Sequence, residues 1–330
     1  QVLIAGNSQG ALLRSADGAS TWTPVHTGNV VVTAIVFSPI KPGLVLAGTR
    51  GGGALVSRDD GATWAGTSGL EGRTVRTFGF SMTVLAAGTD KGVYISQDGI
   101  AWSQSGLANR SIDSLAVTAV HAPVHFLAGS DGPLSAGSVP LFQSTDGGAT
   151  WTTLNPAVSG TYIVTVAAGP LPPIGDMRPV IVGTNAGLFA SADNGSSFLP
   201  LSASGSLPAT DYTQIAFITD HYDRFYAASD GGGSGSGGLW RTNDGGGTFM
   251  SLIPPMRSIT ALAVSNDESP FLYVATFHPS DHVAGLWVYR DTGGTPQGPL
   301  GTPSPAASGS RTSGLSLIHI SEPTRQAEIS

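Results

Sequence analysis

An eight-residue motif recurs along the chain and constrains its fold more than any other feature. The complete form, Ser-x-Asp-x-Gly-x-Thr-Trp, occurs at residues 57–64 and 144–151, and the other copies carry a substitution, a deletion or further decay. The aspartates of the seven copies lie 39 to 51 residues apart and are Asp17, Asp59, Asp98, Asp146, Asp193, Asp244 and Asp291. A repeat of this period indicates an array of similar supersecondary units.

The motif has the chemistry of a tight turn that leads into a strand. A carboxylate at the head of a turn accepts hydrogen bonds from the backbone N–H groups ahead of it, and glycine adopts positive φ at little cost. The Thr-Trp pair begins the next strand, where the indole offers a large apolar face. Four copies end in a tryptophan, namely Trp22, Trp64, Trp102 and Trp151. We therefore interpret the motif aspartates as structural, each satisfied by its own turn.

Between the motifs, each unit follows the same order of short apolar segments. In the second unit, residues 32–37, 44–47 and 54–57 read as three strands, and a fourth begins at residue 63. Four short strands per repeat, separated by turn residues, are the pattern of a β-propeller blade. The sequence therefore predicts an all-β protein, a β-propeller of about seven four-stranded blades over residues 1–294.

The first and last blades are predicted to be incomplete. Gln1 already lies in the second strand of its unit, and Asp291 is followed by the Pro/Gly/Ser-rich residues 295–314, which read as a flexible linker. We expect open strand edges in both blades. Residues 315–330 resemble the translation of a sequencing adaptor, so we expect them to lie outside the fold and the true gene to continue beyond Gly314.

Composition excludes several classes of protein. Charged residues make up 11% of the chain and 46 residues are glycine, which excludes a coiled coil or a helical bundle. The net charge is −7, the lysines are Lys41 and Lys91, and no basic stripe suggests a nucleic-acid or membrane-surface partner. Without cysteine or a long apolar run, we expect no disulfide and no transmembrane segment. We also expect no metal and no cofactor. Low lysine content and Ser/Thr/Gly richness favour an extracytoplasmic or secreted location.

The repeated motif resembles the Asp-box, or bacterial neuraminidase repeat, over residues 1–294. This resemblance implies a propeller whose boxes lie on the outer rim, between the third and fourth strands of each blade. Propellers with this repeat include sialidases, xyloglucan-degrading hydrolases, sortilin-type receptors and photosystem assembly factors. The motif is specific for the fold, and function depends on sites built on the fold.

The signatures of the enzymes in this family are not evident in the sequence. Sialidases carry a Phe-Arg-Ile-Pro segment, an arginine triad and a Tyr/Glu nucleophilic pair, whereas the glutamates here before residue 315 are Glu71 and Glu268. Xyloglucan hydrolases resemble two facing propellers that each supply one catalytic Asp. We therefore predict a non-catalytic binding or scaffold propeller. The alternative is a fragment of a secreted glycoside hydrolase, sialidase-like or xyloglucanase-like.

The face opposite the boxes is the predicted ligand face, for a glycan or a protein partner. There, one polar residue per blade follows the second strand, and further polar residues precede the next blade. The candidate residues of the first kind are Arg50, Asp90, Asp131, Asn185, Asp230 and His278, together with Asn7. Those of the second kind are Arg73, Asp113, Tyr162, Asp211, Tyr212 and Arg257. The oligomeric state is left open.

Ordinary turn chemistry is the competing interpretation of these residues, because Asp, Asn and Gly are common in hairpins. Asp90 and Asp131 would form an acid and base pair only at a suitable separation, which a sequence does not give. His278 and His282, with Asp281, have the spacing of metal ligands on a helix, but they are expected in a loop as solvated side chains. The glycine-rich residues 231–238 are expected to form a hairpin tip.

Overall fold

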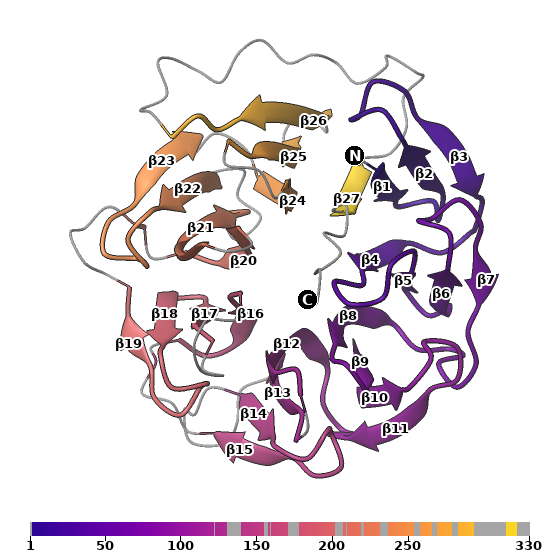
Figure 1. Ribbon diagram of the computed structural model, residues 1–330, viewed down its shortest axis with the longest axis horizontal. Coiled ribbons are helices and arrows are strands. Elements are labelled where there is room, and N and C mark those ends of the chain that lie inside the picture. The colour runs from indigo at the N-terminus through magenta and orange to yellow at the C-terminus, as the bar shows by residue number, and fades with distance from the viewer. Residues whose placement is uncertain are drawn as a thin grey trace, which may run out of the picture.

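The computed structural model of the protein contains strands and no helix within the residues it describes. It describes residues 2–121, 123–130, 140–154, 158, 160–170, 178–201, 207–208, 210–218, 221–231, 237–253, 258–265, 269–278, 283–293 and 315–321. The strands form seven antiparallel sheets arranged as blades around a common axis (Figure 1). The predicted all-β propeller is therefore confirmed.

Blades 2 to 6 each hold four strands in sequence order, from the innermost to the outermost. Blade 2 consists of β4 (Val32–Phe37), β5 (Val45–Thr49), β6 (Gly53–Ser57) and β7 (Ala65–Gly66), and blade 3 of β8 (Val75–Phe80), β9 (Leu85–Thr89), β10 (Gly92–Ser96) and β11 (Ser103–Gly106). Blade 4 consists of β12 (Ile112–Ala119), β13 (His125–Ser130), β14 (Leu141–Ser144) and β15 (Thr152–Leu154). Blade 5 consists of β16 (Ile163–Ala168), β17 (Val180–Thr184), β18 (Gly187–Ser191) and β19 (Leu199–Pro200), and blade 6 of β20 (Tyr212–Ile218), β21 (His221–Ser229), β22 (Gly238–Thr242) and β23 (Met250–Ile253).

Blade 1 combines the two ends of the chain. Its strands are β27 (Leu315–Ser321), β1 (Val2–Asn7), β2 (Leu12–Ser15) and β3 (Thr23–His26), with β27 innermost and antiparallel to β1. The sequence predicts that this blade lacks its inner strand and that residues 315–330 lie outside the fold, and both expectations fail for residues 315–321. The physical reason is that β1 presents a free inner edge, and the apolar residues of Leu315–Ser321 follow largely the period of a strand. The resemblance of the segment to an adaptor stays a prediction about its origin.

Blade 7 has three strands within the residues that the structure describes, and the sequence in which a fourth strand would follow lies outside them. It consists of β24 (Ser258–Val264), β25 (Phe271–His278) and β26 (Val283–Arg290), and no described strand lies outside β26. Where the other blades turn into their fourth strand, this one continues into the proline-rich sequence that follows Gly294. Proline has no N–H to contribute to a sheet, so this sequence is a poor outer strand.

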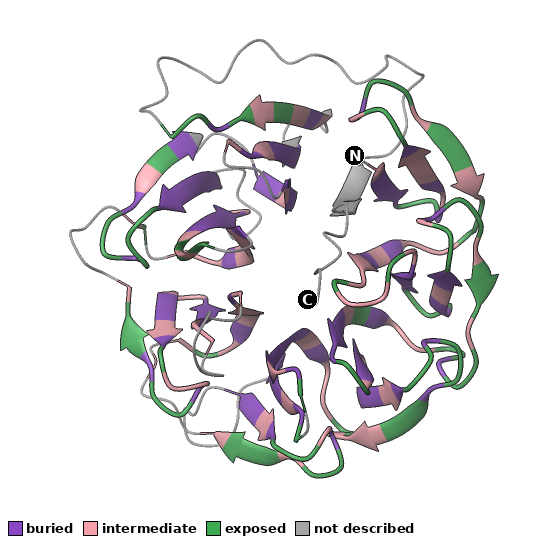
Figure 2. Ribbon diagram, viewed as in Figure 1, coloured by how far each residue is buried: buried purple, intermediate pink, exposed green. Residues whose placement is uncertain are grey.

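The apolar core lies between neighbouring blades. Among the described residues, each of the seven neighbouring pairs of blades encloses its own cluster of buried side chains, including the pair formed by blades 7 and 1. Trp102, for example, is 5% exposed and packs against Phe78 between blades 2 and 3. Figure 2 shows the consequence, with buried residues on the middle strands of each blade and exposed residues on the outer strands. The packing of blade 7 on blade 1 closes the ring.

The motif turns have the predicted hydrogen bonds. In blade 2, Asp59 accepts the Thr63 N–H on Oδ1 at 2.8 Å and the Thr63 hydroxyl on Oδ2 at 2.6 Å. The Ser57 hydroxyl donates to Asp59 at 2.8 Å and accepts the Gly61 N–H at 2.8 Å. The Trp64 Nε1–H donates to the Gly61 carbonyl at 3.0 Å. The same pattern of bonds to the carboxylate recurs at Asp17, Asp146, Asp193 and Asp244.

Asp291 departs from this pattern. Its side chain is fully buried, and Oδ2 accepts the Tyr226 hydroxyl at 2.6 Å, while Oδ1 forms an ion pair with Arg241. Arg224 approaches Oδ2 at 3.3 Å. Tyr226, Arg241 and Arg224 all belong to blade 6, so Asp291 joins two blades. The expectation that it caps its own turn is therefore only partly met, through the Gly293 N–H at 2.9 Å.

Candidate functional site

The two kinds of predicted ligand-face residue share one end of the propeller. Thr49, the last residue of β5, pairs with both Val32 and Gly53, so the hairpin after β5 lies beside the start of the innermost strand of the same blade. Ser57, which opens the box of that blade, pairs instead with Val45 at the start of β5. The boxes therefore lie at the opposite end. We call the end formed by the hairpins between second and third strands, together with the connections between blades, the loop face.

A β-bulge near the start of the innermost strand recurs in six blades. The register shifts there by one residue, so the innermost strand carries one inserted residue whose side chain is re-aimed. The residue before the inserted one is buried, and the inserted residue itself is partly or fully exposed. The inserted residues are Thr33, Arg76, Asp113, Val164, Thr213 and Thr260. The apolar segments of the sequence predict the innermost strands but not the bulge within them.

The charged members of this ring pair with each other. Arg76 on β8 and Asp113 on β12 form an ion pair of 3.1 Å, with 40% and 19% of their side chains exposed. An exposed pair of this kind contributes little to stability, about 0–1 kcal/mol. It does fix a guanidinium and a carboxylate beside each other at the loop-face end of blades 3 and 4. Asp113 is a predicted ligand-face residue, whereas Arg76 is a candidate that sequence reasoning missed.

A second polar pair spans blades 5 and 6. The Tyr162 hydroxyl donates to Asp211 Oδ2 at 3.1 Å, from the approach to β16 to the approach to β20. Burial raises the pKa of Tyr162, and the hydrogen bond to Asp211 and the negative charges of Asp211 and Asp230 raise it further. The phenol therefore keeps its proton at neutral pH and acts as a hydrogen-bond donor. Asp211 and Asp230 make this corner of the loop face acidic.

Two hairpin residues of the predicted set clamp their own blade. Asp90 Oδ1 accepts the Thr74 N–H at 2.9 Å, and Asn185 Oδ1 accepts the Thr161 N–H at 2.9 Å. Both bonds join the hairpin after the second strand to the residues that lead into the first strand. Asn7 behaves as a simple turn residue, since its Oδ1 accepts the N–H groups of its own hairpin. Asn7 therefore serves its own turn, whereas Asp90 and Asn185 each hold a segment outside their own hairpin.

The remaining predicted residues divide into three groups. Arg50 is exposed at its hairpin. The backbone carbonyl of Arg73 accepts the Gly53 N–H at 3.0 Å, and the backbone carbonyl of Asp230 accepts a hydrogen bond from the Ser258 hydroxyl at 2.7 Å. Tyr212 was predicted to lie on the ligand face, and this prediction is wrong. Its side chain is fully buried, donates to the Pro208 carbonyl at 2.8 Å and packs on Trp240. Its place in the alternation of β20 points it into the core. The others, Asp131, Arg257, Asp281, His282 and the side chain of His278, lie outside the described residues.

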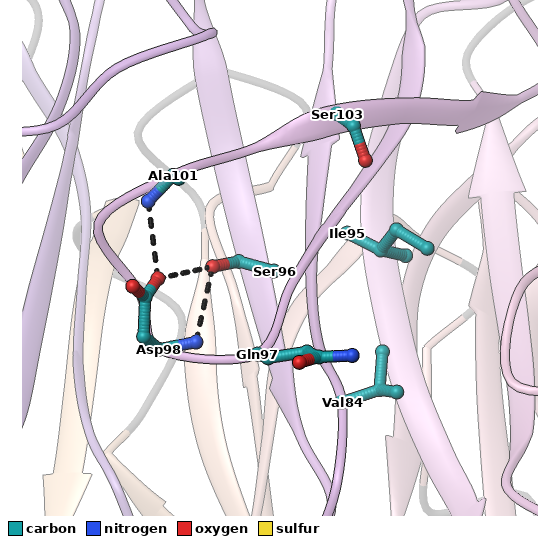
Figure 3. A pocket seen from close by; sticks show the side chains of 7 residues that line it. All are labelled: Val84, Ile95, Ser96, Gln97, Asp98, Ala101 and Ser103. Atoms are coloured by element: carbon teal, nitrogen blue, oxygen red, sulfur yellow. Dashed lines mark hydrogen bonds between the residues drawn. The ribbon is translucent and has the colours of Figure 1, made fainter.

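A shallow hollow of about 330 Å³ lies at the opposite end, beside the box of blade 3 (Figure 3). This copy of the motif is one residue short, and Asp98 Oδ1 alone accepts the bonds from Ile100 N–H at 2.8 Å, Ala101 N–H at 3.1 Å and the Ser96 hydroxyl at 3.0 Å. In blade 2 the Thr63 hydroxyl donates to Asp59 Oδ2, whereas no hydroxyl of the described residues donates to Asp98 Oδ2. The hollow is open to solvent and is not one of the predicted sites.

The described part of the chain contains no group of three His, Asp or Glu side chains arranged to hold a metal ion. No helix in the same residues is long and apolar enough to cross a membrane.

No family model and no curated protein matches the sequence. Solved structures with similar folds include an ancestral GH74 enzyme, with a TM-score of 0.59 at 18% identity over 78% of this chain. YCF48 from Cyanidioschyzon merolae has a TM-score of 0.57 at 17% identity, over 84% of this chain and 91% of its own. A structure of YCF48 bound to D1 peptide has a TM-score of 0.56 at 16% identity, over 82% of this chain and 85% of its own. The extracellular domain of a hybrid two component system from B. thetaiotaomicron gives 0.59 at 15% identity over 82% of this chain.

These similarities establish the fold and not the function, because all lie below 20% identity. This chain spans 38% of the GH74 chain and 33% of the two component system chain. The fold is shared by an enzyme, a peptide-bound protein and an extracellular domain, so the function has to be argued from the loop face.

Proposed function

We propose that the protein is a binding or scaffold propeller of the Asp-box type, whose loop face takes a glycan or protein partner. One observation carries the proposal: the loop face presents two polar pairs, Arg76 with Asp113 and Tyr162 with Asp211, each formed between neighbouring blades. Arg76 and Asp113 lie at the start of an innermost strand, and Tyr162 and Asp211 lie one residue before one, so the ring sets the positions of both pairs.

Such pairs suit recognition of a partner rich in hydrogen-bonding groups. Asp211 keeps acceptor capacity for hydroxyl or N–H groups beyond its bond to Tyr162, and Arg76, 40% exposed, offers donors to a carboxylate or carbonyl. The similarity of the fold to a YCF48 structure with a bound peptide supports a peptide partner. The similarity to an extracellular domain supports an extracytoplasmic location, which is part of the proposal.

The alternative is that the chain is part of a secreted glycoside hydrolase. The observation in its favour is the similarity to an ancestral GH74 enzyme of which this chain spans 38%. Under this alternative, acidic residues of the loop face would act on a sugar. Asp90 is already engaged by the Thr74 N–H, which favours a structural role for it.

The experiment is a screen of a glycan array and a displayed random-peptide library with the purified protein. Hydrolysis of a sialoside and of xyloglucan is measured in parallel. We expect a ligand in at least one library and no hydrolysis. Absence of any ligand in both libraries would contradict the proposal, and so would turnover that is lost in Asp90→Ala or Asp131→Ala.

A further inference from the structure

The outermost strand of blade 7 differs from that of every other blade. β26 is eight residues long, whereas the outer strands of the six other blades are two to four residues long. Very short outer strands leave few unpaired backbone groups and protect a sheet from pairing with another chain. Among the described residues, no strand covers the outer edge of β26, which lies on the perimeter of the ring (Figure 1).

The hydrogen bonds fix which backbone groups of β26 point outward. The Asp291 N–H donates to the Pro270 carbonyl on the β25 side at 2.8 Å. The pairing of β25 with β26 is regular, so the direction of the backbone groups alternates from this point. The N–H and C=O groups of Ala284, Leu286, Val288 and Arg290 therefore face away from β25.

The side chains of β26 do not protect this edge. Val288 is 43% exposed, and Trp287 and Tyr289 are partly buried against the cluster between blades 6 and 7. Arg290 is the charged residue of the strand, and its guanidinium lies over the Phe271 ring at 5.4 Å. The strand contains no proline, lysine or bulge, which are the usual means of blocking an edge.

Residues 291–293, which follow β26, are held toward blade 6. Asp291 is held by Arg241 of blade 6, and Arg241 also donates to the Gly293 carbonyl at 3.1 Å. The sequence that follows is unsuited to pairing with β26, because prolines lack the N–H of a ladder. These prolines are Pro296, Pro299, Pro303 and Pro305.

We propose that the outer edge of β26 pairs with β26 of a second copy of this chain, antiparallel and about a two-fold axis. A two-fold contact needs the same surface on both subunits, and an apolar strand with one charged end provides this. The four outward-facing residues all pair when Leu286 lies opposite Val288 of the partner subunit and Ala284 opposite Arg290 of the partner subunit. The two arginines then lie at opposite ends of the joint, whereas a parallel pairing would place them side by side. The two seventh blades form one continuous sheet.

The test measures the mass of the full chain by light scattering across a hundredfold range of concentration. The wild type is expected to form a dimer of the 33.4 kDa chain. Val288→Lys places a charge at the joint, and Val288→Pro removes an outward N–H without touching the bonds to β25. Each is expected to weaken dimerisation by at least about tenfold while the thermal unfolding midpoint of the monomer stays unchanged.

The matched control is Leu199→Lys, at the most exposed large apolar side chain, 73% exposed, on the two-residue strand β19. It changes the charge equally and is expected to leave the dimer intact. A register test uses the absence of cysteine from the chain: a disulfide is expected when Leu286→Cys and Val288→Cys proteins are mixed, and less of it when Val288→Cys is oxidised alone. A wild type that stays monomeric at every concentration, or a dimer that persists in both Val288 variants, would overturn the proposal.

Discussion

The charge of a box aspartate is tied to the turn that it holds. The side-chain and backbone hydrogen bonds of Thr63 lower the pKa of Asp59 from 3.8 to about 2. The corresponding donors, Thr21, Thr150 and Ser197, lower the pKa values of Asp17, Asp146 and Asp193 to about 2. A group whose pKa is depressed on folding contributes stability above its unfolded pKa and loses it as the pH falls through the folded value. The boxes are therefore expected to make folding acid-sensitive between about pH 4 and pH 2.

Asp59→Asn isolates this contribution. The variant is expected to be less stable than the wild type at neutral pH, and the difference between their free energies of unfolding should shrink toward pH 2. Urea unfolding at several pH values provides the measurement. Asp60→Asn is the control, because it removes the same charge at the adjacent residue, whose carboxylate accepts no hydrogen bond from the described residues. Equal pH profiles for both variants would contradict the assignment.

Gly69 occupies a position where a neighbouring blade leaves no room for a side chain. It adopts φ +84°, and an added Cβ would lie 2.0 Å from the Trp102 carbonyl oxygen of the next blade. Gly51 adopts a similar φ of +76° with no atom within 4 Å of the same position. Gly51→Ala is expected to cost the backbone strain alone, about 1–2 kcal/mol. Gly69→Ala should cost a further ~1–3 kcal/mol because the backbone of blade 3 has to shift. Equal losses in chemical denaturation would show that this contact does not matter.

At the scale of elements, the last blade replaces a box with a buried ion pair. Burial alone would raise the pKa of Asp291, but hydrogen bonds from Arg241 and Tyr226 and the charge of Arg241 hold it below its usual range. Arg241 is 1% exposed, so the loss of Asp291 would leave the positive charge of Arg241 buried without a compensating negative charge. The pair therefore holds the end of β26 to blade 6.

Removing one member of this pair is expected to be costly. Asp291→Ala leaves Arg241 buried without its ion-pair partner and should lower the free energy of unfolding by about 3–5 kcal/mol. The double variant Asp291→Leu with Arg241→Met removes both charges and should be more stable than the single variant. Denaturant unfolding of Asp291→Leu, Arg241→Met and the double variant gives the coupling free energy between the two residues. Additive losses would show that the two residues act independently.

At the scale of the whole molecule, the ring is closed by β27 beside β1 and by the packing of blade 7 on blade 1. Deleting residues 315–330 exposes the inner edge of β1 and is expected to lower the thermal unfolding midpoint and promote aggregation. Deleting residues 322–330 leaves β27 in place and is the control. An unchanged midpoint after both deletions would show that β27 is dispensable, as the adaptor interpretation expects.

The repeat predicts the blades because each box encodes its own turn, and Asp59 with Ser57, Thr63 and Trp64 needs no information from elsewhere in the chain. The closing strand was not predictable in this way, since the contact of Leu315–Ser321 with β1 joins opposite ends of the sequence. The ligand face was predicted as a region, but its pairs were not. Arg76 and Asp113 each lie at the bulge of an innermost strand, which the apolar pattern does not predict. Tyr212 was predicted for the ligand face but points into the core.

The most direct test of the proposed binding face compares two variants for their affinity toward one ligand selected from the libraries. The loop-face variant combines Arg76→Gln with Asp211→Asn, and the box-face variant combines Lys41→Gln with Arg58→Gln, whose side chains donate to the Gln97 and Asp98 carbonyls at the opposite end. Titration calorimetry is expected to show at least about tenfold weaker binding for the loop-face variant and wild-type binding for the other. Wild-type affinity in the loop-face variant, or a loss confined to the box-face variant, would contradict the account.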